Sequence, residues 1–320
     1  MKIALMDGGS VNMGDLSWEG LKRFGDVVET TIVAPGSDPV PMIGDADVAI
    51  GSKLVITAAV MDACPNLKFI NVPATGYQCV DLDAARARGI AVANVPRYST
   101  DAVAQHIFAL LLNHSNKVMI HNEAVKNGEW CTAPAFCYVK SPLMELAGKT
   151  FAVVGYGAIG RRTLELAQAF GMKTIAVAHH PEQTKSIQPG VTLVDRETAF
   201  RTADVLAMTC PLTEETVNMV DARMLAMMKP TAFLINTARG QLIDENALID
   251  ALNNGVIAGY GADCVYYEPM RPGCGVPYAK NAVVTSHIAW SAKETRARMI
   301  EIVLSNMESW LSGGRLNRVD

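Results

Sequence analysis

The segment VVGYGAIG, residues 153–160, constrains the fold of this chain more than any other feature. It places Gly155, Gly157 and Gly160 in a G-x-G-x-x-G pattern, directly after an apolar run and before a segment with helical spacing. In such a context the first glycine permits a tight turn, the second lets backbone approach a pyrophosphate, and the third lets the helix lie close to the strand. The helix N-terminus also favours negative charge. The segment therefore predicts a dinucleotide-binding turn, and the alternative is a glycine turn that serves packing alone.

Strand-like and helical segments alternate along two stretches of the chain. The first stretch runs from KIALMD at 2–7 to IAVAN at 90–94, and the second runs from KTFAVV at 149–154 to about residue 287. A long helical segment from 99 or 100 to 128 separates them, and another helical segment covers 293–312. This pattern predicts an α/β fold with parallel sheets covered by helices on both faces. Because single cores stop growing at roughly 250–300 residues, a chain of 320 residues favours two domains.

Composition narrows the classes of ligand. The net charge is -4, so the chain offers no basic field for nucleic acid or an anionic membrane surface, and a small-molecule ligand is expected. No apolar run approaches the roughly 20 residues that span a bilayer and no signal peptide is visible, so we expect a cytoplasmic protein. Seven cysteines are scattered without CxxC pairs, which predicts reduced thiols and no metal site.

The carboxylate that normally follows a dinucleotide turn is missing. An Asp or Glu about 20 residues after the glycines usually binds the adenosine ribose, and here that position is Ala178. Its absence removes a repulsion of a 2′-phosphate, which His179, His180 and Lys185 could contact. We therefore expect NADPH to be accepted or preferred, increasingly so as the pH falls toward about 6. The alternative is that these are solvated loop residues and that NAD binds through its other contacts.

Three residues suited to catalysis follow predicted strands. TAFLINTARG delivers Arg239, VIAGYGADCVYYEP delivers Glu268, and NAVVTSHIAW delivers His287. Since ligands of open α/β sheets bind beyond the carboxyl ends of the strands, all three should share the edge that carries the glycine turn. A guanidinium can hold a carboxylate, an imidazole can give a proton, and a carboxylate can hold the imidazole in its charged form. Each residue alone has a structural explanation, but together they predict reduction of a 2-oxo acid by hydride transfer.

These motifs have a family resemblance. GYGAIG, CPLTEET, LINTARGQLIDENAL, GADCVYYEP and SHIAWSA, in this order, resemble the D-2-hydroxyacid dehydrogenase family. The segment NVPATGYQCVDLDAARARGIAVANVPRYSTDAVAQHIFALLL is similar to its glycerate dehydrogenase, or hydroxypyruvate (glyoxylate) reductase, branch. One further departure is Thr209, where many members have His before Cys-Pro.

The resemblance implies roles for particular residues. Arg239, Glu268 and His287 would be the catalytic trio, with His287 as acid/base. The expected substrate contacts are Lys53, Ala74, Thr75, Gly76, Tyr77, Arg239 and Trp290. The expected cofactor contacts are Thr75, Gly155, Gly157, Ala158, Ile159, Gly160, Ala178, His179, His180, Cys210, Thr237, Ala238, Arg239, Asp263 and His287. Within this set, Asp263 would lie at the nicotinamide carboxamide.

The family's architecture would place a Rossmann nucleotide domain, 99–288, inside a flavodoxin-like substrate domain formed by 1–98 and 289–320. The active site would then lie in the cleft between the domains, where closure excludes water. The resemblance also implies a homodimer formed through the nucleotide domains. The aromatic-containing segment 129–148 is a candidate dimer loop, or else an ordinary surface loop.

The expected activity is NAD(P)H-dependent reduction of hydroxypyruvate or glyoxylate to D-glycerate or glycolate. Other acids of the family stay open, namely pyruvate, branched 2-oxo acids and phosphoglycerate. Formate dehydrogenase is disfavoured because its histidine is paired with Gln rather than with Glu. A nucleotide-sensing, corepressor-like binding protein is the alternative from another class, and the intact trio argues against it.

Overall fold

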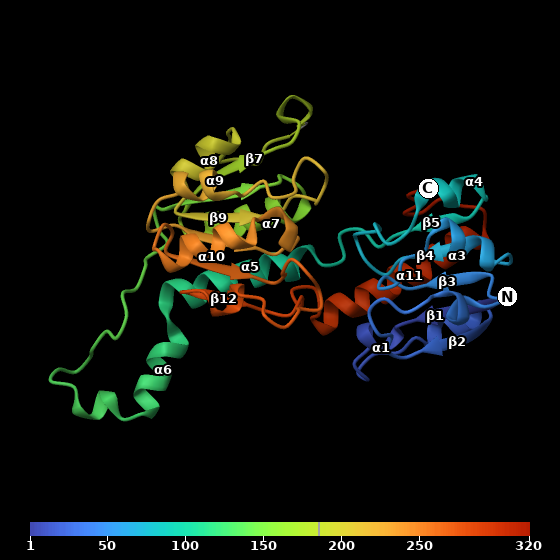
Figure 1. The fold of residues 1–320 in the computed structure, drawn as a ribbon, viewed down its shortest axis with the longest axis horizontal. Coiled ribbons are helices and arrows are strands. Elements are labelled where there is room, and N and C mark those ends of the chain that lie inside the picture. The colour runs from blue at the N-terminus through green and yellow to red at the C-terminus, as the bar shows by residue number, and fades with distance from the viewer. Residues whose placement is uncertain (185) are drawn as a thin grey trace. The chain divides into compact units, whose positions relative to one another are not determined.

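The chain folds into two compact units. The computed structural model describes residues 1–184 and 186–320, so Lys185 lies outside the described residues. One unit comprises Met1–Ser99 with Trp290–Asp320, and the other comprises Thr100–Ala289. The middle of the chain is therefore inserted into a unit made by its two ends (Figure 1).

The discontinuous unit contains a five-stranded parallel sheet with the strand order β2-β1-β3-β4-β5. The strands are β1 (Lys2–Met6), β2 (Asp26–Thr30), β3 (Val48–Ile50), β4 (Phe69–Asn71) and β5 (Ala91–Ala93). The helices are α1 (Gly8–Val11), η1 (Glu19–Arg23), α2 (Val40–Ile43), α3 (Ala58–Ala63), α4 (Leu82–Ala87) and α11 (Lys293–Leu311). Every residue of β3, β4 and β5 is buried, because helices cover both faces of the sheet.

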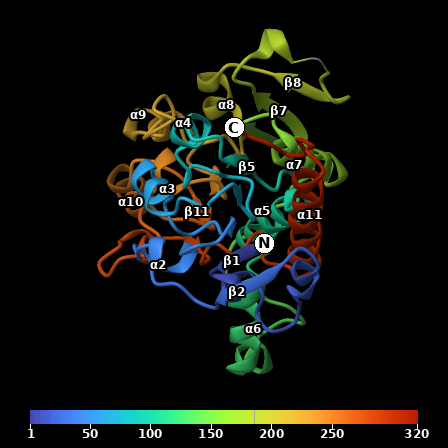
Figure 2. The ribbon, with the colours of Figure 1, turned by 90° about the vertical axis from the view of Figure 1, so that its right-hand side faces the viewer.

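Alternate side chains of β1 show how the two faces are covered. Ile3 and Leu5 lie in a cluster with Met299 and Val303 of α11, whereas Met6 lies in the cluster of α2, α3 and α4. In Figure 2 α11, drawn in red, runs beside this sheet. The C-terminal helix thus supplies one of the two layers that the N-terminal strands need.

The inserted unit contains a seven-stranded parallel sheet with the order β12-β11-β10-β9-β6-β7-β8. The strands are β6 (Thr150–Val154), β7 (Lys173–Val177), β8 (Val191–Leu193), β9 (Val205–Met208), β10 (Phe233–Asn236), β11 (Gly259–Ala262) and β12 (Ala282–Val284). The chain runs outward in one direction from β6 to β8 and in the other from β9 to β12. The strand order therefore reverses between β6 and β9, which is the Rossmann switch point.

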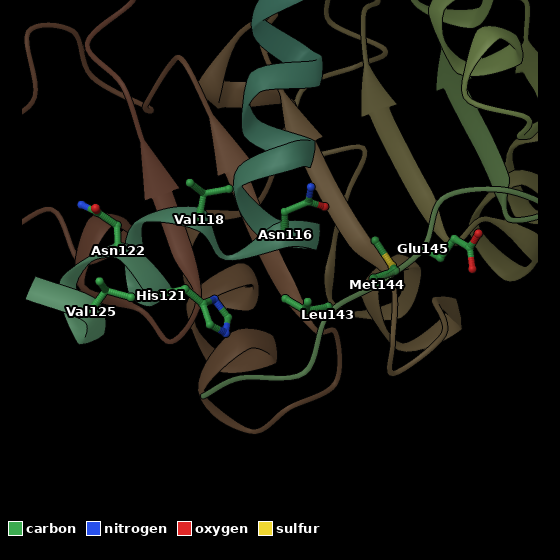
Figure 3. A pocket seen from close by; sticks show the side chains of 8 residues that line it. All are labelled: Asn116, Val118, His121, Asn122, Val125, Leu143, Met144 and Glu145. Carbon is green, nitrogen blue, oxygen red and sulfur yellow. The ribbon is translucent and has the colours of Figure 1, made fainter. Parts of the chain in front are cut away.

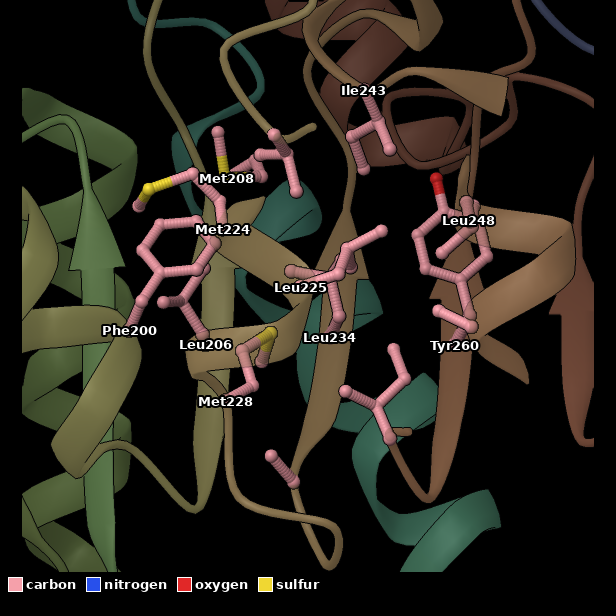
Figure 4. Packing of buried hydrophobic residues seen from close by; sticks show 14 of the residues in the cluster. Phe200, Leu206, Met208, Met224, Leu225, Met228, Leu234, Ile243, Leu248 and Tyr260 are labelled. Atoms are coloured by element: carbon pink, nitrogen blue, oxygen red, sulfur yellow. The ribbon is translucent and has the colours of Figure 1, made fainter. Parts of the chain in front are cut away.

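Helices cover both faces of this sheet as well. They are α5 (Thr100–Asn116), α6 (Val118–Lys126), α7 (Ala158–Ala169), α8 (Arg196–Thr202), α9 (Ala222–Met227) and α10 (Glu245–Asn253), with short 3-10 turns η2 (Glu129–Thr132), η3 (Pro181–Gln183), η4 (Gly240–Leu242) and η5 (Val276–Tyr278). On one face Phe200, Met224 and Leu248 of α8, α9 and α10 pack on Leu234 and Tyr260 (Figure 4). α5 and α7 pack on the other face.

The predicted fold class, two doubly wound parallel-sheet domains, is confirmed, and one helix differs from expectation. The helical segment expected from 99 or 100 to 128 is two helices, because Lys117 adopts a left-handed conformation with φ 52°. Among the residues that the structure describes, no helix is long and apolar enough to cross a membrane.

Candidate active site

The glycine turn lies at the switch point of the seven-stranded sheet. Gly155 follows β6 with φ 109°, and a Cβ there would lie 2.5 Å from the backbone nitrogen of Cys210, which follows β9. A Cβ on Gly160 would lie 2.2 Å from the carbonyl oxygen of Gly155. Both positions therefore require glycine, the first for its backbone conformation and both for close approach. Thr209 donates a hydrogen bond of 2.7 Å to the Gly155 carbonyl and so braces this turn.

Space and unused hydrogen-bond donors lie in front of this turn. Nothing stands within 4 Å of where a Cβ on Gly157 would be, and Gly157 caps α7 without a side-chain acceptor for the first N–H groups. Ala158 and Ile159 form the first turn of that helix. Exposed N–H groups at a helix N-terminus are suited to a pyrophosphate. Among the described residues, the hydroxyl of Thr237 is the one buried side-chain polar atom without a hydrogen-bond partner. It is therefore available to form a hydrogen bond with a bound ligand.

Two uncharged residues, Cys210 and Ala178, lie beside the turn. Burial raises the pKa of the Cys210 thiol to about 11, which keeps it protonated. Ala178 follows β7, whose last residue, Val177, accepts a hydrogen bond of 2.9 Å from Gly155. The expected ribose position is therefore beside the glycine turn. His179 and His180 follow it on the surface, with ring centroids 4.1 Å apart.

A carboxylate does enter this loop, although not at residue 178. The Oε1 atom of Glu182 lies 3.5 Å from Nδ1 of His180, and both side chains are more than half exposed. A sequence count that looks only at the strand end misses it, since Glu182 lies in the 3-10 turn η3, beyond that position. The loop therefore holds an acidic side chain, Glu182, which would repel a 2′-phosphate, next to His180, which would attract it when protonated.

The turn after β10 is shaped by a buried asparagine. Asn236 is fully buried, its Oδ1 accepts from the Ala238 N–H at 3.1 Å, and its Nδ2 donates to the Arg239 carbonyl at 2.9 Å. This holds residues 237–239 at the carboxyl end of the sheet, with the half-buried Arg239 donating to the Ala238 carbonyl at 2.7 Å.

Glu268 and His287 are in direct contact. Nδ1 of His287 lies 2.7 Å from Oε2 of Glu268, and both side chains are a little over one third exposed. Burial acts to raise the pKa of the Glu268 carboxyl, but the His287 hydrogen bond, the Val265 N–H and the charge of Arg239 together hold this pKa below its ordinary value. The carboxylate is thus ionised and oriented toward the imidazole, which leaves Nε2 of His287 as the ring nitrogen that faces away from it.

Asp263 is engaged within the protein. Its carboxylate is 2% exposed and accepts hydrogen bonds from the backbone of Ile288 at 2.9 Å and Ala289 at 2.7 Å and from the hydroxyl of Thr285 at 2.6 Å. The Thr285 hydroxyl also lies 2.8 Å from Nε2 of His106 on α5. Neither Thr285 nor His106 was expected from the sequence. The only signal for His106 in the sequence was its position as a polar residue directly before the apolar pair Ile107 and Phe108.

The expected substrate contacts in the discontinuous unit form two groups. Ala74, Thr75, Gly76 and Tyr77 form a loop after β4, in which Thr75 is exposed and its carbonyl accepts from Asn94 at 2.8 Å. Separately, Nζ of Lys53 lies 5.9 Å from the centre of the Trp290 ring.

Fold and site together define a class of protein. A Rossmann sheet with a glycine turn at its switch point, and a carboxylate-imidazole pair and an arginine beyond its strands, define a dinucleotide-dependent oxidoreductase. Residues 108–289 match the family model described as D-isomer specific 2-hydroxyacid dehydrogenase, NAD binding domain. The chain therefore belongs to the D-isomer-specific 2-hydroxyacid dehydrogenase family, as its motifs predicted. It is an oxidoreductase that uses a nicotinamide dinucleotide to reduce 2-oxo acids to D-2-hydroxy acids.

Named relatives agree with this assignment. The chain is 38% identical to a hydroxypyruvate reductase of Blautia hydrogenotrophica over the whole of both chains. It is 37% identical to a glycerate dehydrogenase of Methylorubrum extorquens over 86% of each. Among solved structures it is similar, with a TM-score of 0.86 and 28% identity over the whole of both chains, to the acyclic imino acid reductase Bsp5 in complex with NADPH and D-Arg.

Proposed function

We propose that this enzyme reduces hydroxypyruvate or glyoxylate to D-glycerate or glycolate, with Arg239, Glu268 and His287 as its catalytic residues. The contact of 2.7 Å between Glu268 and His287, which follow β11 and β12 of the sheet whose β6 leads into the glycine turn, is the observation that carries the proposal. The two relatives described above are named for hydroxypyruvate and for glycerate, the oxidised and the reduced form of one C3 acid, which supports this substrate class.

Arg239, His287 and Glu268 have different roles in the proposed reaction, which follow from their charges. A bound nicotinamide dinucleotide supplies the hydride that reduces C2 of the acid. The guanidinium of Arg239 holds the substrate carboxylate in a fork and polarises the carbonyl oxygen. His287 donates its Nε2 proton to that oxygen, and Glu268 orients the ring through Nδ1 and stabilises the imidazolium before the transfer. The hydride and this proton together convert the carbonyl into the hydroxyl of the product.

The glycine turn and the neighbouring strand ends would hold the cofactor. The open space at Gly157 and the uncapped start of α7 suit the pyrophosphate, and the unpartnered hydroxyl of Thr237 suits a further polar contact. The remaining cofactor contacts proposed are Thr75, Gly155, Ala158, Ile159, Gly160, Ala178, His179, His180, Cys210, Ala238, Arg239, Asp263 and His287. Asp263 would contribute largely through the backbone that it holds, because its carboxylate already accepts three hydrogen bonds.

Substrate contacts are proposed in the discontinuous unit as well. The exposed ammonium of Lys53 and the half-buried ring of Trp290 offer a charge for a carboxylate and a wall for a short carbon chain. The loop of Ala74, Thr75, Gly76 and Tyr77 offers backbone donors. A wall of this kind favours small acids over branched ones.

We propose that NADPH is accepted and can be preferred. Ala178 removes the carboxylate that would repel a 2′-phosphate, while His179 and His180 become attractive as they protonate. Glu182 opposes this, because it pairs with His180. Lys185, the third expected phosphate contact, lies outside the described residues.

A homodimer through the nucleotide domain is proposed from the surface around α6. Eight large apolar side chains between residues 118 and 143 are exposed, namely Val118, Met119, Ile120, Val125, Trp130, Phe136, Val139 and Leu143. In Figure 1 α6 and the segment after it project from the body of their unit. A groove of about 780 Å³ lies there between α6 and residues 143–145 (Figure 3). An exposed apolar patch on a projecting element is typical of a protein interface, and a second copy has the same patch to offer.

The direct test is an absorbance assay of nicotinamide oxidation. Hydroxypyruvate, glyoxylate, pyruvate and a branched 2-oxo acid are each supplied with NADH and with NADPH, and kcat/KM is compared. We expect the highest values with hydroxypyruvate or glyoxylate. A preference of about tenfold or more for pyruvate or a branched acid would contradict the proposed substrate class.

A further inference from the structure

We infer that His106 is a positioning residue for the catalytic turn, acting through Thr285 and Asp263 on the backbone that carries His287. The inference rests on the proposed role of His287 as proton donor. Three places in the sequence form one chain of contacts within the inserted unit, namely His106 on α5, Asp263 after β11, and the segment from Thr285 to the turn at 286–289 after β12.

The turn needs an external brace. His287 has a left-handed backbone with φ 57°, which costs free energy for a residue with a Cβ and persists only where neighbouring structure enforces it. The enforcing contacts on the far side are the two backbone N–H groups of Ile288 and Ala289, both bound by Asp263. Asp263 thereby fixes the backbone from which the His287 side chain extends, and Glu268 fixes the orientation of the imidazole ring.

The direction of the hydrogen bonds follows from proton counting. The Thr285 hydroxyl has a single proton, and its contact of 2.6 Å with Oδ1 of Asp263 uses that proton, because a carboxylate can only accept. The hydroxyl oxygen must then accept at its 2.8 Å contact with His106, so Nε2 of His106 is protonated and donates. His106 thus sets the rotamer of Thr285, and Thr285 completes the donors around Asp263.

Charge and rigidity support the same role. Asp263 is nearly fully buried, and Nε2 of His106 lies 3.6 Å from its Oδ1, so His106 also offers the carboxylate a nearby positive or polar edge. The residues after His106, Ile107 and Phe108, are buried in the core beneath the sheet. His106 therefore projects from a helix that cannot easily shift, which makes it a fixed reference point for the turn.

The test compares substitutions that remove or keep the donor. His106→Phe and Thr285→Val remove the contact at similar side-chain size, whereas His106→Gln keeps an N–H near the position of Nε2. His114→Gln is the matched control, since His114 lies on the same helix and packs on Phe233 without joining this chain of contacts. The measurements are kcat and KM for hydroxypyruvate, Kd of the reduced cofactor, thermal unfolding, and hydrogen exchange of the Ile288 and Ala289 amides.

We expect His106→Phe and Thr285→Val each to lower kcat by about tenfold, with KM and Kd within about twofold, because a displaced acid affects the transition state more than binding. The double variant should be no slower than the single ones, since both break one chain. His106→Gln should restore most of kcat, and His114→Gln should leave it unchanged. Amide exchange at the turn should quicken only in the two disruptive variants.

Two results would overturn the inference. One is unchanged amide exchange at Ile288 and Ala289 in His106→Phe and Thr285→Val, which is measurable with or without turnover. The other is an equal loss of kcat in His106→Gln and His114→Gln, which would indicate general loss of packing. A wild-type enzyme that reduced none of the 2-oxo acids would instead refute the proposed function, and the exchange measurement would still decide the role of His106.

Discussion

At the residue scale the proposed chemistry depends on which ring nitrogen of His287 is held by Glu268. Glu268 occupies Nδ1 at 2.7 Å, and the combined pull of His287, the Val265 N–H and Arg239 keeps the pKa of Glu268 low enough for it to stay a carboxylate. In the proposed mechanism the transferred proton is therefore the one on Nε2. This division of the ring is the reason for expecting a large effect from a single substitution.

Replacing His287 by Ala should lower kcat by about a hundredfold or more, since general acid catalysis contributes on that order. Binding of NADPH and NADH, followed by nicotinamide fluorescence, should persist because the glycine turn is untouched. His114→Gln, at a residue that packs on Phe233 outside the proposed site, serves as the control at pH 7. A kcat of His287→Ala within a few-fold of the wild type would refute the assignment.

Restoring a carboxylate at residue 178 should reverse the cofactor preference. Ala178→Asp should lower kcat/KM for NADPH by about tenfold or more relative to NADH, because the new charge repels the 2′-phosphate. Glu182→Gln should move the ratio the other way by freeing His180. In the wild type the NADPH to NADH ratio should rise as the pH falls from about 8 to about 6. If the NADPH to NADH ratio stayed constant with pH and in both variants, His179 and His180 would be loop residues without a role in cofactor preference.

The sequence predicted where these residues lie in the fold when the signal is local. Glycine spacing and strand ends located Gly155, Arg239 and His287 on one edge of one sheet, because parallel strands deliver their ends to the same side. It did not predict the contact of His106 with Thr285, since the two residues are 179 positions apart and meet only through packing. Glu182 was missed for the opposite reason, because its turn has no strong local signal.

At the element scale α5 carries two histidines with different surroundings. His106 makes a polar contact, whereas His114 stacks on Phe233 with ring centroids 4.0 Å apart. Burial lowers the pKa of His114 to about 4, with a smaller contribution from Lys117. The helix ends two residues later, and the left-handed Lys117 redirects the chain into α6.

His114 should make the stability of its unit depend on pH. Its pKa is about 4 when folded and about 6.5 when unfolded, so the unfolded state binds the proton more readily between these values. Its contribution is full above about pH 6.5 and is lost as the pH falls toward 4, by up to about 3 kcal/mol. Denaturant unfolding at pH 7 and 4.5 should show a smaller loss for His114→Gln than for the wild type. Equal losses would contradict the depressed pKa.

At the scale of the whole molecule the proposed dimer predicts a mass of twice 34.3 kDa in solution. Replacing Phe136, which is 90% exposed, and Val118 by Asp should yield monomers, because two charges would enter each apolar surface. Light scattering with size-exclusion chromatography measures the mass. Ile32→Asp, at a residue that is 78% exposed in the other unit, is the control and should stay dimeric. A monomeric wild type would refute the proposal.

The insertion of one unit into the other also orders events during synthesis. Met299, Val303 and Met307 of α11 cover Ile3, Leu5 and Phe69, yet the whole inserted unit, Thr100–Ala289, separates these strands from that helix in the sequence. The first five strands thus leave the ribosome with one apolar face bare, and it stays bare while the whole nucleotide-binding unit is made and can fold. The unit that begins the chain is the last to mature, so its open sheet is where a chaperone would find this nascent protein.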